Sequence, residues 1–181
     1  MFTIHAGEYL VGDYIERKFG KRWNVWIPSK DTGIDLLVTD KKNHRTASLQ
    51  VKFGKDFLPG KSADLRKQLR CHSWFTLARV KLHRSKAEFW VFVLPGFASN
   101  SPDFIVVPTA KLRRHMDQIH GRKENLQVYL TSTKRKCWET RTLRNEDLLK
   151  IAKDTYENPK LNLSEYMNGV GWNAVKATLE D

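Results

Sequence analysis

Residues 33–52 read GIDLLVTDKKNHRTASLQVK, with two runs of alternating apolar and polar side chains on either side of a polar turn. This pattern predicts a β-hairpin with strands over Gly33–Thr39 and Thr46–Phe53. We expect the chain to turn at Lys42 and Asn43, within the segment DKKNHR. The two sequence positions of every cross-strand pair then have the same sum, so the position of the turn predicts which residues face each other.

Three polar side chains share one face of this hairpin. Asp35 lies directly opposite Gln50, and Lys52 lies two residues further along the same face. A slip of one residue would bury all three polar groups, so the hydrophobic pattern itself fixes their outward direction. The opposite face collects only apolar side chains, those of Ile34, Leu36, Val38, Ala47, Leu49 and Val51.

A carboxylate, an amide and a lysine on one face have a chemical use. Carboxylate and amide oxygens are hard ligands suited to Mg²⁺, which keeps several waters and bridges to substrate phosphate. A lysine beside them can position a water and stabilise charge that develops on the phosphate. By themselves, however, Asp35 and Lys52 could equally be surface residues that form a cross-strand ion pair.

The hairpin and the segment before it resemble a known family of nucleases. AGEYLVGDYIERKFG reads as a helix with an early Gly-Glu pair, and it is followed by DTGIDLLV and then by ASLQVK. Together these pieces, from Ala6 to Lys52, resemble the core of the PD-(D/E)XK nucleases. The similarity is to the Mrr-like restriction endonucleases, whose motif is Q-x-K.

The resemblance implies a metal-dependent endodeoxyribonuclease that hydrolyses DNA phosphodiester bonds. It places Glu8, Asp35, Gln50 and Lys52 in the catalytic site, the first three as metal ligands. The implied cofactor is Mg²⁺, with Mn²⁺ as a substitute. Gln50 stands where many relatives have a second acid of the motif, so the site has two fixed negative charges and the number of metal ions stays open.

The full chain of 181 residues predicts one α/β domain. We expect a restriction-endonuclease-like core of order α-β-β-β-α-β, with a central mixed β-sheet flanked by helices. The core would span about residues 5–131, and a C-terminal helical extension about residues 145–181. Helices are predicted over His5–Gly20, Ser62–Arg70 and from Thr109 to His120, and Trp74–Leu82 is ambiguous.

The charge distribution indicates a polyanionic partner. The net charge is +12, and residues 41–144 hold twenty-three basic and seven acidic side chains. Clustered Lys and Arg release counterions from phosphates, so we expect this block to bind DNA, although a solvated basic face would look the same. The expected contacts with the DNA backbone are Lys55, Lys61, Arg66, Lys67 and Arg70.

Several alternatives remain at this stage. The fold could carry a catalytically inactive DNA-binding module, or a nuclease that acts on RNA.

The sequence predicts no membrane segment and no secretory signal, and Cys71 and Cys137 have no metal-ligand spacing, which favours a cytoplasmic protein. Cleavage of both strands of a duplex would favour a homodimer.

Overall fold

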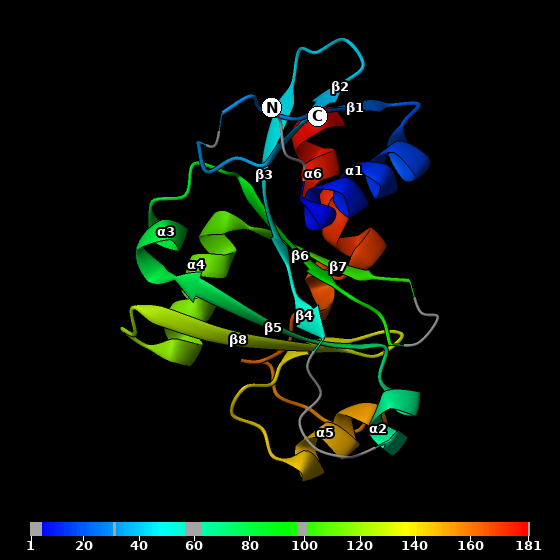
Figure 1. The fold of residues 1–181 in the computed structure, drawn as a ribbon, viewed down its shortest axis with the longest axis vertical. Coiled ribbons are helices and arrows are strands. Elements are labelled where there is room, and N and C mark those ends of the chain that lie inside the picture. The colour runs from blue at the N-terminus through cyan, green and yellow to red at the C-terminus, as the bar shows by residue number, and fades with distance from the viewer. Residues whose placement is uncertain (1–4, 31, 57–62, 98–100, 181) are drawn as a thin grey trace.

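The computed structural model describes residues 5–30, 32–56, 63–97 and 101–180, and within them the chain forms two β-sheets and a set of helices (Figure 1). The helices are α1 (Ala6–Phe19), α2 (Ala63–Gln68), α3 (Arg79–His83), α4 (Thr109–His120), α5 (Asn145–Ala152) and α6 (Asn168–Glu180), with a 3-10 turn η1 (Ser164–Tyr166). The strands are β1 (Trp23–Trp26), β2 (Leu36–Asp40), β3 (Thr46–Phe53), β4 (Lys55–Asp56), β5 (Cys71–Ala78), β6 (Phe89–Leu94), β7 (Asp103–Pro108), β8 (Asn125–Ser132) and β9 (Cys137–Glu139).

The central sheet has the strand order β1-β2-β3-β6-β7. Strands β3 and β6 run parallel, whereas the other neighbouring pairs run antiparallel. Strand β6 reads FWVFVL and is buried along its whole length, as expected for a strand covered on both faces. The predicted α/β fold with a mixed central sheet flanked by helices is therefore confirmed.

Helices α1 and α6 cover one face of the central sheet and lie next to each other (Figure 1). Tyr14 of α1 stacks on Trp172 of α6 with ring centroids 5.7 Å apart. Below them, Val11 and Ile15 of α1 pack with Val175 of α6 onto the apolar face of the hairpin. Helices α1 and α6, far apart in the sequence, thus pack into one hydrophobic core.

The other face of the central sheet packs against α4 and a second sheet of order β4-β5-β8-β9, all antiparallel. Trp90 and Phe92 of β6 meet Phe75 and Leu77 of β5 in this core. The sequence does not predict that β8 belongs to a sheet separate from the central one. Helices α2 and α5 cover the far end of this second sheet, at the bottom of Figure 1.

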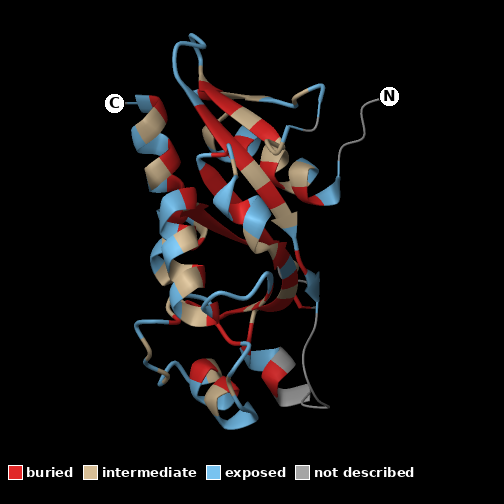
Figure 2. Ribbon diagram, turned by 90° about the vertical axis from the view of Figure 1, so that its left-hand side faces the viewer, coloured by how far each residue is buried: buried red, intermediate tan, exposed pale blue. Residues whose placement is uncertain are grey.

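The predicted hairpin is confirmed in register. Leu36 pairs with Leu49 and Val38 pairs with Ala47, as a turn at Lys42 and Asn43 requires. Asn43 has a positive φ of 57°, which asparagine tolerates in tight turns. The apolar face of the hairpin lies within the core, and Figure 2 shows the central strands as mostly buried.

Candidate active site

The position of Asp35 is fixed by the backbone of β3. Its N–H donates to the carbonyl of Leu49 at 2.8 Å, and β2 begins at the next residue. The Asp35 carboxylate accepts the N–H of Val51 at 2.7 Å and an N–H of the Gln50 amide. Just before β2 begins, a side-chain oxygen of Asp35 thus accepts a backbone N–H of β3, and this hydrogen bond holds Asp35 beside Gln50.

A close approach of α1 to β3 brings Glu8 to the same place. Gly7 is buried, and a Cβ there would lie 3.0 Å from Cβ of Phe53 and 3.2 Å from Cγ1 of Val51. The missing side chain therefore lets the first turn of the helix rest directly on the strand. Glu8 follows Gly7, and its Oε2 accepts the N–H of His5 at 3.1 Å, which also stabilises the start of the helix.

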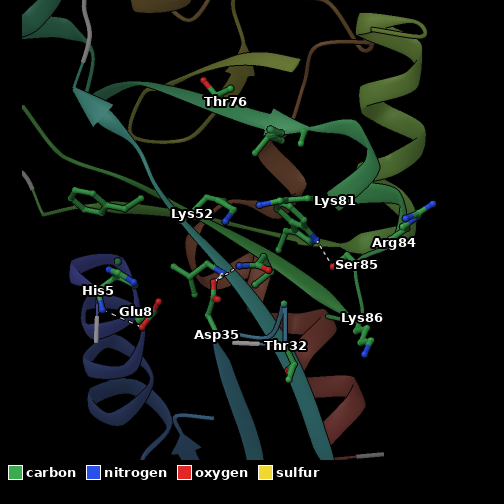
Figure 3. A pocket seen from close by; sticks show the side chains of 18 of the residues that line it. His5, Glu8, Thr32, Asp35, Lys52, Thr76, Lys81, Arg84, Ser85 and Lys86 are labelled. Carbon is green, nitrogen blue, oxygen red and sulfur yellow. Dashed lines mark hydrogen bonds between the residues drawn. The ribbon is translucent and has the colours of Figure 1, made fainter. Parts of the chain in front are cut away.

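Lys52 emerges from β3 on the same face as Gln50. Its Nζ lies 5.7 Å from the ring centroid of Trp90, which is almost completely buried and donates its N–H to Ser85 at 3.1 Å. The ammonium group of Lys52 thus lies over a buried, hydrogen-bonded aromatic ring. Figure 3 shows its ammonium group in the space that Asp35 and Glu8 also face.

An open cleft of about 1070 Å³ joins these side chains. Glu8, Asp35, Gln50 and Lys52 all line it, although they come from α1, from the loop before β2 and from β3. The structure therefore brings together the four residues that the sequence groups into one site. His5 and Thr32 lie at its edge (Figure 3).

The cleft has a basic side that the sequence pattern does not predict. Lys81 and Arg84 come from α3 and its end, and Lys86 follows shortly after. All three side chains are exposed and line the cleft, and we call them the basic rim (Figure 3). Their run in the sequence, RVKLHRSK, is a visible signal, but it lies in and after a segment whose secondary structure is ambiguous from the sequence.

The five residues predicted to contact DNA lie elsewhere or outside the described part. Lys55 is exposed in β4, with its Nζ 5.8 Å from the ring centroid of Trp74, and Lys67 is exposed in α2. Lys61 and the side chain of Arg66 are outside the described residues. Arg70 forms an ion pair with the buried carboxylate of Asp103 at 3.1 Å, and this hydrogen-bonded contact raises the pKa of Arg70.

The oxygen donors of the cleft fit a hard divalent cation. Glu8 and Asp35 each provide a carboxylate, and Gln50 provides an amide oxygen. Within the described residues there is no group of three or more His, Cys, Asp or Glu side chains that could hold a metal ion. A magnesium ion is commonly bound by only one or two carboxylates, with waters and substrate phosphate completing its shell, so the smaller set is sufficient.

Comparisons with known proteins add no relative. No family model, curated protein or solved structure matches this chain. The expected nuclease family thus rests only on the sequence between Ala6 and Lys52. In the part of the chain that the structure describes, every helix is too short or too polar to cross a membrane.

Proposed function

We propose that this protein is a Mg²⁺-dependent endodeoxyribonuclease with a restriction-endonuclease-like core of the PD-(D/E)XK type. The observation that supports this most strongly is the convergence of Glu8, Asp35, Gln50 and Lys52 on one open cleft. Two of these residues are held by contacts that a surface ion pair does not require. The Asp35 carboxylate accepts the N–H of Val51, and Glu8 is positioned by the close contact of Gly7 with β3.

In this proposal Glu8, Asp35 and Gln50 hold the cation through their side-chain oxygens. A bound divalent cation supplies Lewis acidity to the phosphate and to the attacking water. The ammonium of Lys52 donates a hydrogen bond to that water and offsets the negative charge that builds up on the phosphoryl oxygens. The water oxygen bonds to phosphorus while the bond to the leaving oxygen breaks. The water releases a proton to solvent, and the leaving oxygen takes one up.

The basic rim gives the cleft a means of holding the substrate. Lys81, Arg84 and Lys86 line the same cleft as the two carboxylates, so phosphates on either side of the scissile bond would meet positive charge. Without such cations, the carboxylates of Glu8 and Asp35 would repel a polyanion. The arrangement of acids beside cations therefore suits a phosphodiester substrate better than a neutral one.

The activity is tested by incubating the purified protein with supercoiled plasmid, linear duplex, branched DNA and single-stranded DNA. We expect cleavage of at least one of these with Mg²⁺ or Mn²⁺, and none with EDTA. Tight DNA binding without cleavage of any of them in either metal would instead identify an inactive binding module.

A further inference from the structure

The chain passes from one sheet to the other at Gly54. Strand β3 ends at Phe53 in the central sheet, and Lys55 opens β4 in the second sheet. A Cβ at Gly54 would lie 2.7 Å from both Ser73 and Phe75 of β5, so only glycine fits without displacement. This corner joins the wall of the cleft to the outer face of the second sheet.

Phe53 stands at this corner with its ring uncovered. Its Cβ is packed against Gly7, yet 48% of the residue is exposed. It lines the cleft, as does Val80 of α3, which is 54% exposed. Exposed large apolar side chains in a cleft that also contains carboxylates and lysines are not part of a core, and they offer a surface to an apolar part of a ligand.

Further aromatic side chains continue from the corner along the second sheet. Lys55 pairs with Trp74 of β5, and its ammonium lies over the Trp74 ring. Trp74 is half-buried, donates its N–H to Gln127 and lies stacked beside Tyr129 of β8 at 6.4 Å. Thr76, two residues along the same face of β5, is among the residues that line the cleft. We call Phe53, Lys55, Trp74 and Tyr129 the aromatic strip.

We propose that the aromatic strip binds a DNA strand whose bases are unpaired, with the basic rim and Lys52 holding its phosphates. The placement of that strand at the scissile position rests on the proposed nuclease function, whereas the binding itself does not. Bases in an intact duplex are stacked on each other, so a protein surface meets mainly phosphate and sugar. Aromatic side chains interleaved with lysines match instead a single strand, whose bases stack on the rings while the cations follow the backbone. The preferred substrate is therefore DNA with a single-stranded segment beside the site.

The test measures binding in EDTA, where no cleavage can interfere. A labelled single strand of about 16 nucleotides, enough to span such a surface, is compared with the same sequence as a blunt duplex. We expect tighter binding of the single strand. Phe53→Leu and Trp74→Leu should each weaken it at least about fivefold, because base–aromatic stacking is lost. The dependence on salt should not change, because neither substitution removes a charge.

Two further variants complete the design. Trp26→Leu removes an aromatic residue that is 50% exposed but does not line the cleft, and it should bind the single strand as the wild type does. Trp74→Phe keeps a ring and should largely restore binding. Equal affinity for duplex and single strand, or strip variants that bind like Trp26→Leu, would overturn the inference. If the inference fails in this way, divalent-dependent cleavage of duplex DNA would still support the proposed nuclease. If the strip variants weaken single-strand binding but the protein cleaves no DNA, the inference holds and the nuclease proposal fails.

Discussion

The carboxylate of Asp35 accepts the backbone N–H of Val51 at 2.7 Å, which ties the residue just before β2 to the middle of β3. The backbone N–H of Val51 is present whatever side chain residue 51 has, so this hydrogen bond does not depend on a neighbouring side chain. Asn at this position can accept the same hydrogen bond through its amide oxygen. Asp35→Asn therefore removes the negative charge while leaving the local structure in place, which makes it a clean probe of the proposed chemistry.

Replacement of Gln50 by Glu tests how the site holds a cation. The Gln50 amide now donates to Asp35, and a carboxylate there would face another carboxylate. Like charges raise carboxylate pKa values when no metal is bound, whereas a divalent cation favours the ionised forms. We expect Gln50→Glu to bind Mg²⁺ or Mn²⁺ more tightly in calorimetry, and to gain more thermal stability from the metal than the wild type does. Unchanged metal affinity would exclude Gln50 as a direct ligand.

The close contact at Gly7 predicts a loss of activity from a single methyl group. In Gly7→Ala the new Cβ would meet Phe53 at 3.0 Å and Val51 at 3.2 Å, so β3 and the first turn of α1 must separate slightly, and a movement of this turn carries Glu8 with it. We expect cleavage to fall about tenfold or more, since small displacements of positioning groups are costly.

A second glycine of the same helix supplies the control. A Cβ at Gly12 would meet Val25 at 3.9 Å, an ordinary contact. Gly12→Ala should keep full activity and should stabilise the fold by up to about 1 kcal/mol in urea denaturation. Equal activity of the two alanine variants would mean that the approach of α1 does not position Glu8.

The basic rim predicts how DNA binding depends on salt. Removal of Lys81, Arg84 and Lys86 by alanine should weaken binding at low salt and reduce the slope of log affinity against log salt by about two to three. The matched control replaces Lys150, Lys153 and Lys160, which do not line the cleft, and it changes the net charge by the same amount. Slopes that agree between the two triple variants would show that the rim makes no phosphate contacts.

A buried carboxylate predicts a pH dependence of stability. Glu139 of β9 is fully buried, and burial raises its pKa to about 7, although the N–H of Tyr129 donates to it at 3.3 Å. The folded protein therefore binds a proton that the unfolded chain releases near its ordinary pKa of 4.5. The stabilisation that protonated Glu139 provides is fully present below pH 4.5 and is lost as the pH rises towards 7.

Glu139→Gln removes this titration. Compared with the wild type, the free energy of unfolding of the variant should rise between pH 5 and pH 8, by on the order of 3 kcal/mol at most. The difference between the two proteins is the quantity to measure, because burial also lowers the pKa of His72 to about 4 and so gives the wild type an opposing trend. A difference that does not change with pH would contradict a neutral Glu139.

The hairpin and its polar face were predictable because strict alternation allows only one register. The convergence of Glu8 on that face was not readable from spacing alone, since it depends on the contact between Gly7 and β3; the family resemblance grouped Glu8 with the hairpin residues. Likewise, no local sequence pattern predicts that α6 packs beside α1.

The second sheet could not be predicted for two local reasons. Strand β5 ends at Ala78 and helix α3 begins at Arg79, so the segment Trp74–Leu82 has neither the period of a strand nor that of a helix along its whole length. Strand β9 is short, and it buries Glu139 completely, a residue that sequence patterns place on the surface. The cleft is lined by residues of both sheets, so the basic rim of the cleft and the aromatic strip beside it become visible only in the structure.

The most direct test of the account is the rate of DNA cleavage by Asp35→Asn and Lys52→Ala at equal purity, with circular dichroism to confirm the fold. Asp13→Asn serves as the control, because Asp13 pairs with Arg17 on α1 and does not line the cleft. The account predicts that the wild type and Asp13→Asn cleave DNA with Mg²⁺ and stop with EDTA, while both site variants lose at least about a hundredfold in rate. Cleavage at the wild-type rate by either folded site variant would contradict it.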